Sequence, residues 1–362
     1  MIKLKDKVSA FFVFFLITSS QVGVGVLGFQ RVIGQYAGHD AWIAVIIAGI
    51  AISVIIWIMY RLLSHHDIGD IVAIHRFTYG KWLGAIFTLL FTAYLMLMTA
   101  VVLRTYVEVI QVWMFPHIKI WALLLLILPL VYYTISSEFR TVVGVCFLGV
   151  VYPSLLLLTL FYPLKYATLT NIMPVMDHSV TELMQSSSLA VLEFIGFSAL
   201  LVFYPYIRDA VKSQTYAHLG NGYSLLIYLM VSLVTYLYYN QTELREVIWP
   251  TLGLWKIIEL PFFARFEYLG IATLFFAILP NLVLLVWASA RTLDRTFNAG
   301  HKRMAILLLV ILFVANIVLT DRMTIGVLNN VLGNIGLGFL FGYVPFLFVL
   351  NWIRRKGQKN GP

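Results

Sequence analysis

The chain has 362 residues, of which 61% are hydrophobic and only 11% are charged. Soluble domains carry about 25% charged residues, so this composition, with a mean hydropathy of +0.91, excludes a soluble globular protein and predicts a polytopic membrane protein. The formal net charge is +9. The basic residues lie mainly at the ends of apolar runs, which indicates orientation in a membrane and excludes nucleic acid as the partner.

Apolar runs of about 20 residues are needed to cross a bilayer as helices. The sequence predicts ten such crossings in a single transmembrane domain covering residues 1–362, all helical because lipid leaves an open backbone without hydrogen-bond partners. The ten predicted crossings are residues 8–35, 41–63, 81–115, 120–135, 142–164, 183–206, 219–239, 268–290, 304–319 and 331–353. The even number and the excess of Lys and Arg on one set of connections place both termini in the cytoplasm.

The first crossing contains a polar, glycine-rich stretch, TSSQVGVGVLGFQ, at residues 18–30. Ser and Gln compete with the backbone for hydrogen bonds, and Gly costs about 1 kcal/mol relative to Ala in a helix. We therefore expect this helix to unwind within the bilayer, where irregular backbone is tolerated only if protein buries it or it lines a cavity. The stretch predicts a small-molecule site whose first residues are Gln21, Val22, Gly23, Val24 and Gly25.

The same stretch admits two other interpretations. The glycine spacing also matches a dinucleotide fingerprint, which we reject because the flanks are membrane-like and supply neither a preceding strand nor a following amphipathic helix. The simpler alternative is that the small residues only allow helices to approach closely.

The third crossing carries three candidate site residues. Tyr94 lies near its middle, where it can close a pocket or simply pack as an aromatic side chain. Arg104 and Glu108 are four residues apart and share a helix face, which predicts an internal ion pair, with a proton-transfer or gating role as the sharper alternative. Before this crossing, the mixed apolar and polar connection at residues 65–81 predicts a short interfacial helix.

The sixth crossing contains Glu193, Gly196, Ser198 and Pro205, and ionisable residues within a crossing usually mark function. The glycine and serine predict a second unwound point. Interruptions at corresponding places in two five-helix halves, about residues 8–164 and 183–353, predict an inverted-repeat transporter fold with a midplane site. Glu193 is expected to pair with another crossing or to hold a proton.

Helix polarity then indicates the ligand. The outer half of the first crossing presents free N–H groups at residues 22–25, and the first half of the sixth presents free carbonyls at Phe194, Ile195 and Gly196. An anion receptor beside a cation receptor suits a zwitterion, of which a free amino acid is the simplest. A neutral polar ligand such as a sugar or nucleoside is the alternative. Asn281, in the eighth crossing, is expected to close the pocket or to join helices.

The remaining features predict no catalysis. The sequence shows no metal-ligand spacing and no nucleophile–base arrangement, so we expect no enzymatic activity, no metal and no cofactor. The eight histidines lie in connections or at crossing ends and are expected to be solvated. The long connection at residues 240–267, with Pro250, Pro261, Trp249 and Trp255, predicts a lid over the outer mouth, with an aromatic belt at the interface as the alternative.

Several short motifs in order resemble one family. They are SSQVGVGVLGFQR (19–31), GKWLG (80–84), NIMPV (171–175), the run from Glu193 to Pro205, WPTL (249–252), IELP (258–261) and the basic stretch after the eighth crossing. Together they resemble the B subunit of the bacterial spore germinant receptors, a branch of the amino acid–polyamine–organocation transporter superfamily. The resemblance covers nearly the whole chain.

The resemblance implies a LeuT-like fold in the inner membrane of the dormant spore, assembly with an A subunit and a lipoprotein C subunit, and recognition of a germinant, often an amino acid. It implies that Gly23 and Gly25 hold the ligand carboxylate and that the carbonyls of residues 194–196 hold its ammonium. The fifth crossing lacks the lysine that proton-coupled relatives can carry there. That departure favours a ligand sensor over an active secondary transporter. A structural membrane subunit with a vestigial pocket is the third alternative.

Overall fold

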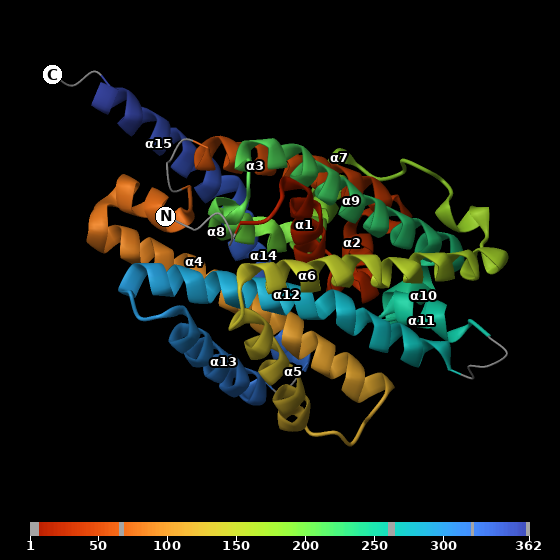
Figure 1. Ribbon diagram of the computed structural model, residues 1–362. Coiled ribbons are helices and arrows are strands. Elements are labelled where there is room, and N and C mark those ends of the chain that lie inside the picture. The colour runs from red at the N-terminus through yellow and green to blue at the C-terminus, as the bar shows by residue number, and fades with distance from the viewer. Residues whose placement is uncertain (1–6, 65–68, 260–264, 320–321, 360–362) are drawn as a thin grey trace.

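The computed structural model describes residues 7–64, 69–259, 265–319 and 322–359, and these form a bundle of helices (Figure 1). No strand forms within these ranges, where an isolated parallel bridge joins Val8 to Ile207. Eight helical stretches there are long and apolar enough to cross a membrane, and Ala10–Gln21 and Ile120–Ile135 are shorter apolar helices. The predicted all-helical membrane fold is confirmed.

The first half of the chain consists of α-helices and short 3₁₀ helices. In chain order they are η2 (Ala10–Phe12), α1 (Val13–Gln21), η3 (Val24–Leu27), α2 (Phe29–Ala37), η4 (Gly38–Asp40), α3 (Ala41–Leu63), α4 (Ile71–Trp113), α5 (Ile120–Ile135), α6 (Phe139–Val151), η5 (Pro153–Phe161), η6 (Pro163–Tyr166) and η7 (Leu169–Ile172). The η elements of this half are 3₁₀ helices. Pro153 ends α6 because proline has no N–H to continue an α-helix.

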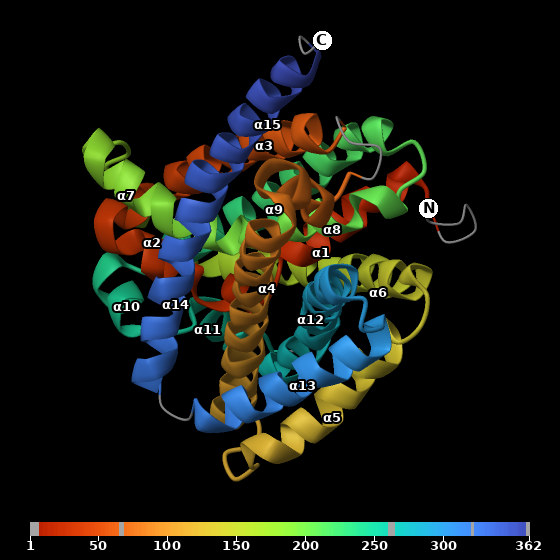
Figure 2. The same ribbon diagram turned by 90° about the vertical axis from the view of Figure 1, so that its left-hand side faces the viewer.

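The second half begins with the segment that was expected to unwind. Its elements are α7 (Val180–Val191), η8 (Leu192–Ala199), α8 (Leu200–Phe203), η9 (Tyr204–Tyr206), η10 (Ala210–Lys212), α9 (Ser213–Tyr238), α10 (Gln241–Glu246), α11 (Pro250–Lys256), α12 (Phe266–Phe297), α13 (His301–Val318), α14 (Arg322–Leu337), the π-helix η11 (Gly338–Tyr343) and α15 (Val344–Lys359). Helices α4 and α12 pack side by side through the middle of the bundle, and α5 and α13 flank them (Figures 1 and 2).

Helix α4 is two helices joined at Gly80, where the backbone has φ 83° and ψ −172°. This left-handed conformation is accessible to glycine at little cost. The part before Gly80 begins at Ile71 and is capped by the carboxylate of Asp70, which accepts from the N–H of Ala73 at 2.9 Å. A helix therefore forms in the predicted connection. Residues 65–68 of that connection lie outside the described residues, and the interfacial position stays a prediction.

The sixth segment does not unwind, which corrects the expectation of a second broken helix. Residues Leu192–Ala199 tighten from α to 3₁₀ geometry and keep right-handed helical dihedral angles at both junctions. The reason lies at Gly196, where a Cβ atom would stand 1.8 Å from the carbonyl oxygen of Ser20. The glycine allows two backbones to approach closely, and the large apolar neighbours keep the segment wound.

The connection after α9 folds back onto the first segment, as the lid prediction requires. Thr251 of α11 donates to the carbonyl of Val26 at 2.8 Å and accepts from Gln30 at 2.8 Å. Trp249 and Trp255 are 8% and 3% exposed. Buried indoles exclude the aromatic-belt alternative for these two residues. Pro261 lies outside the described residues.

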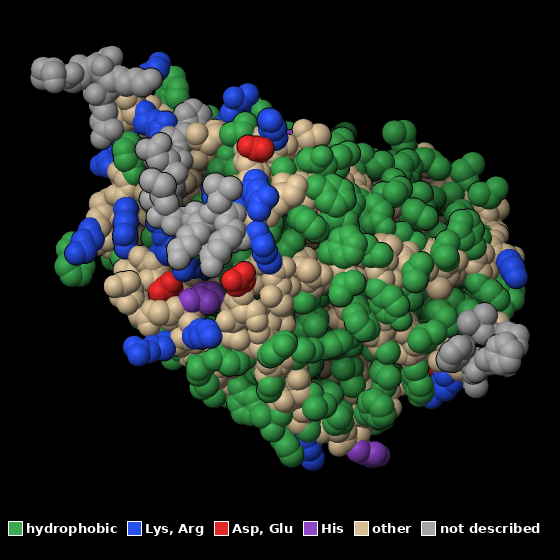
Figure 3. All heavy atoms as spheres, viewed as in Figure 1, with side chains coloured by type: hydrophobic (Ala, Val, Ile, Leu, Met, Phe, Trp, Pro, Cys, Tyr) green, Lys and Arg blue, Asp and Glu red, His purple; other side chains and the backbone are tan. Residues whose placement is uncertain are grey.

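The surface matches a membrane protein. Hydrophobic side chains cover the middle of the face drawn in Figure 3, and Lys and Arg gather at the end where α15 and the first part of α4 lie. The lid helices α10 and α11 lie toward the opposite end (Figure 1). An apolar girdle bounded by charged ends is what a bilayer selects.

Candidate functional site

The first segment is interrupted at the predicted place. Helix α1 ends at Gln21, Val22 is extended (φ −90°, ψ 112°), and Gly23 is extended with φ −144° and ψ −150°. The chain resumes as the 3₁₀ helix η3 at Val24. A helix that ends inside a protein leaves backbone groups without intrahelical partners. Neighbouring side chains must therefore satisfy them, and they define the candidate site.

Tyr228 of α9 bridges the interruption. Its hydroxyl donates to the carbonyl of Gln21 at 2.8 Å, and the backbone of Gly23 contacts the same hydroxyl. The side chain is fully buried, and its ring centroid lies 4.9 Å from that of Phe29 and 5.2 Å from that of Phe194. A single rigid side chain thus holds both ends of the break, which makes the break a defined structure.

A polar network anchors the end of α1. The amide nitrogen of Gln21 donates to Asn221 Oδ1 at 2.9 Å, and Asn221 Nδ2 donates to the carbonyl of Gly49 and to Ser53 Oγ, each at 2.9 Å. The network joins α1 to α9 and α3. Gln21 Oε1 is buried and accepts no hydrogen bond from the described residues.

Glu193 lies directly against Gly25. A Cβ atom built on Gly25 would stand 1.7 Å from Glu193 Oε2. The hydroxyl of Tyr228 is 3.4 Å from the same oxygen. The carboxyl of Glu193 therefore fills the space over Gly25 in which the resemblance implies a ligand carboxylate, and the ligand-binding role of Gly23 and Gly25 stays a prediction.

The carbonyls of Phe194, Ile195 and Gly196 are not free, contrary to the second half of that expectation. Winding into a 3₁₀ helix gives backbone carbonyls i→i+3 partners, and Ser198 Oγ also donates to the carbonyl of Ile195. The expected ammonium receptor is absent because the segment never unwinds.

Asn281 and Tyr94 lie where the sequence predicted them, beside the first and sixth segments. Asn281 Nδ2 donates to the carbonyl of Ser20 at 3.0 Å, and Asn281 Oδ1 is buried and has no partner among the described residues. The hydroxyls of Ser198 and Tyr94 are 3.5 Å apart. The first, third, sixth and eighth segments therefore meet around the break, as the sequence predicts.

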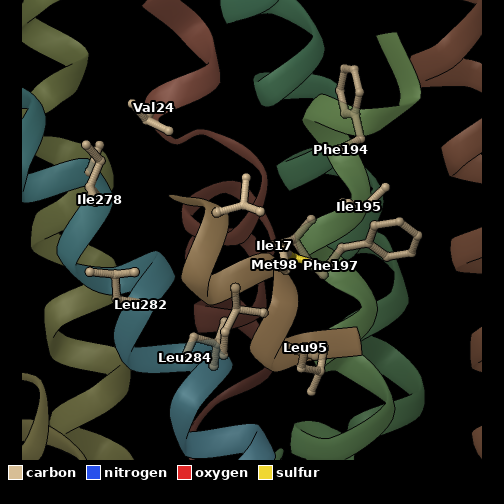
Figure 4. Close-up of a cluster of buried hydrophobic side chains, with 14 of the residues drawn as sticks. Ile17, Val24, Leu95, Met98, Phe194, Ile195, Phe197, Ile278, Leu282 and Leu284 are labelled. Carbon is tan, nitrogen blue, oxygen red and sulfur yellow. The ribbon is translucent and has the colours of Figure 1, made fainter. Parts of the chain in front are cut away.

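Apolar side chains fill most of the space between these segments. Figure 4 labels side chains of this cluster that come from α1, η3, α4, η8 and α12: Ile17, Val24, Leu95, Met98, Phe194, Ile195, Phe197, Ile278, Leu282 and Leu284. A cavity of about 60 Å³ lies beside the break, between α1, η5, α9, α11 and α12. Val22 borders it, and no charged side chain lines it.

The third segment carries the two charged residues, Arg104 and Glu108, for which an ion pair is predicted. Arg104 is 3% exposed, and its Nε donates to the carbonyl of Leu319, at the end of α13. Glu108 lies one turn further along α4 and is half-buried. The ion pair between them stays a prediction.

Sequence reasoning missed the contribution of α9. Tyr228 and Asn221 belong to a stripe of polar residues at helical spacing on this helix. The stripe is visible in the sequence and could have indicated that α9 contributes to the site. Its members are Asn221, Ser224, Tyr228, Ser232 and Thr235, all at most 1% exposed. A buried polar stripe on a membrane helix predicts contact with irregular backbone or with other polar side chains.

The histidine expectation was wrong at two positions. His75 is fully buried between Thr88 Oγ1 and the hydroxyl of Tyr343, each 2.9 Å from a ring nitrogen. His39 is 3% exposed and stacks on Tyr236. Both rings are covered by elements distant in sequence, which the position of a residue near a crossing end does not reveal.

Comparison with known proteins assigns the family. A family model described as spore germination protein matches residues 7–325. This chain belongs to that family. It is 37% identical to spore germination protein GerQB of Bacillus cereus over 355 residues, which cover 98% of each chain. It is 20% identical to spore germination protein A2 of Bacillus subtilis (strain 168) over 339 residues, covering 92% of this chain and 93% of the relative.

Solved structures share the fold. A Na⁺-coupled sialic acid symporter in a substrate-bound, outward-open state superposes with a TM-score of 0.64 and 13% identity, covering 96% of this chain and 79% of the other. A nucleobase-cation-symport-1 family transporter in a closed conformation superposes with a TM-score of 0.61 and 13% identity, covering 96% of this chain and 78% of the other. The chain is thus an integral membrane protein of a spore germination family with the fold of LeuT-like transporters.

Proposed function

We propose that this protein is the membrane subunit of a spore germinant receptor, which binds a small germinant at the break in the first segment and signals to partner subunits. The ligand class proposed is the free amino acids. The observation that carries the proposal is the interruption at Val22 and Gly23, which side chains of η8, α9 and α12 hold together. A break held by three neighbours transmits a ligand-induced shift to each of them.

The arrangement suits a sensor for a physical reason. A ligand shifts a protein between two states only by binding one of them more tightly. The lid helix α11 bonds directly to η3 through Thr251 and Val26, so a ligand that displaces η3 also displaces the lid. The proposal includes ten crossings in two inverted halves, both termini in the cytoplasm, residence in the spore inner membrane and assembly with the A and C subunits.

An active secondary transporter for amino acids or amines is the second candidate. The two solved structures are transporters, and this favours it. Uptake of radiolabelled amino acids into proteoliposomes separates the candidates. Saturable, gradient-driven accumulation by the purified protein alone would establish transport and refute a pure sensor.

Germination of spores tests the sensor directly. In a strain whose own copy of the gene is deleted, spores carrying Gly25→Ala are expected to need at least about tenfold more germinant than spores carrying the wild-type chain. Gly222→Ala is the matched control, because its Cβ meets no atom within 4 Å. A wild-type response from Gly25→Ala spores, with normal amounts of protein in the membrane, would place the ligand site elsewhere.

A further inference from the structure

The carboxyl of Glu193 occupies the side of the break that helix polarity assigns to an anion. It lies against Gly25 so closely that any side chain there would overlap its oxygen. Gly25 belongs to η3 (Val24–Leu27), the short 3₁₀ helix with which the chain resumes after the break. The protein thus supplies its own anion to the position, and a ligand carboxylate entering the site would meet a like charge.

No cation balances this carboxyl among the described residues. Asp40, Asp70, Glu267 and Asp294 each have a basic side chain within ion-pair distance, whereas no described basic side chain pairs with Glu193. The hydroxyl of Tyr228 lies 3.4 Å from Glu193 Oε2, and its proton already serves the carbonyl of Gln21 at 2.8 Å. A carboxylate removed from water without a cation loses several kcal/mol, so the site favours any positively charged group that reaches it.

A second acceptor faces the other side of the break. Asn281 is 4% exposed, and its Nδ2 is committed to the carbonyl of Ser20 at 3.0 Å. This bond fixes the orientation of the amide and leaves Oδ1, an acceptor, without a partner among the described residues. Asn281 Nδ2 lies 3.6 Å from a Cβ built on Gly23. An amide oxygen without a partner and a carboxyl without a cation therefore lie beside Gly23 and Gly25, and both favour a ligand that donates hydrogen bonds.

We propose that the site recognises the ammonium group of its ligand through Glu193 and Asn281 and does not require a ligand carboxylate. This inference rests on the proposed function and narrows the ligand class to small primary amines, with amino acids recognised through the amine. Binding moves the Glu193 carboxyl off Gly25 and onto the ammonium. The movement loosens the contact between η8 and η3, which links occupancy to the rest of the bundle.

Matched pairs of compounds test the recognition. L-alanine and ethylamine, L-leucine and 3-methylbutylamine, and L-lysine and 1,5-diaminopentane differ only by the carboxylate. The purified full-length chain is heated in detergent with each compound, because a ligand that binds the folded state raises the unfolding midpoint by mass action. We expect at least one amine to raise the midpoint at concentrations no higher than its amino acid requires.

Two variants complete the experiment. Glu193→Gln keeps the shape of the side chain and removes its charge, and it is expected to weaken amine binding by about tenfold or more, since charged hydrogen bonds are about twice as strong as neutral ones. The unfolding midpoint of this variant without ligand should not fall, because the substitution removes a buried carboxyl that has no cation beside it. Glu138→Gln, at an exposed carboxylate at the start of α6, is the control and should bind like the wild type.

The outcomes distinguish a failure of the ammonium-recognition inference from a failure of the proposed function. Amino acids that bind while every matching amine fails would overturn the inference and leave the proposed function intact. Unchanged amine binding in Glu193→Gln would overturn it too, as would the absence of binding by all three amines. The proposed function itself stands or falls on the germination of Gly25→Ala spores, which does not depend on these probes.

Discussion

Segments one and six carry similar sequence signals, yet only segment one leaves the helix. Segment one places Ser19, Ser20 and Gln21 within two residues of its first glycine, so polar side chains compete for the backbone next to the point where glycine weakens the helix. In segment six, Gly196 stands between Ile195 and Phe197, both at most 3% exposed. A glycine that follows polar residues permits a break, whereas a glycine among large apolar residues permits close approach of two backbones.

The substitution with the largest expected effect on stability tests the role of glycine in the close approach of two backbones. Gly196→Ala puts a Cβ 1.8 Å from the carbonyl oxygen of Ser20, a backbone atom that cannot rotate away. We expect a loss of about 3 kcal/mol in the free energy of unfolding, the upper end for overpacking. Denaturant unfolding of the purified protein measures it, with Gly222→Ala as the control. A loss under about 0.5 kcal/mol would show that η8 and α1 do not approach this closely.

Gly25→Ala should have a smaller and reversible effect, because its new Cβ overlaps the mobile end of a side chain. The overlapping atom is Glu193 Oε2, at 1.7 Å. We expect a loss of about 2 kcal/mol alone and recovery of about 1 kcal/mol or more when Glu193→Ala is added, since residues in contact are energetically coupled. No such second substitution should rescue Gly196→Ala. Additive losses in the Gly25→Ala, Glu193→Ala double variant would disprove the contact.

The sequence predicted the helical class, the broken first segment and the meeting of segments one, three, six and eight, because composition and local polarity carry those signals. It could not predict that Glu193 points to Gly25 or that His75 is buried, because both depend on the rotation of packed helices. It also read Gly196 as a break, although the backbone carbonyl of Ser20 that requires a glycine there lies 176 positions earlier in the chain.

Tyr228→Phe tests what holds the break in shape. Losing the hydroxyl leaves the buried carbonyl of Gln21 without its 2.8 Å donor, at an expected cost of about 1–2 kcal/mol. Amide hydrogen exchange should rise at residues 22–25. Tyr223→Phe is the matched control, because its hydroxyl bonds to Ser154 Oγ at 2.7 Å, a side-chain atom rather than the backbone of the break. Equal exchange in both variants would show that Tyr228 does not fix the break.

Gly23→Ala should change stability least, although Gly23 lies at the centre of the break. Its φ of −144° is open to any residue, and a Cβ there meets only Asn281 Nδ2, at an ordinary 3.6 Å. We expect a change within about 0.5 kcal/mol. The informative measurement is the germinant response. Alanine favours helix over glycine by about 1 kcal/mol, so if activation rewinds the break, Gly23→Ala spores should respond to less germinant. If activation keeps the break open, their dose response should match that of the wild type, whereas a need for more germinant would mean that the ligand contacts Gly23 itself.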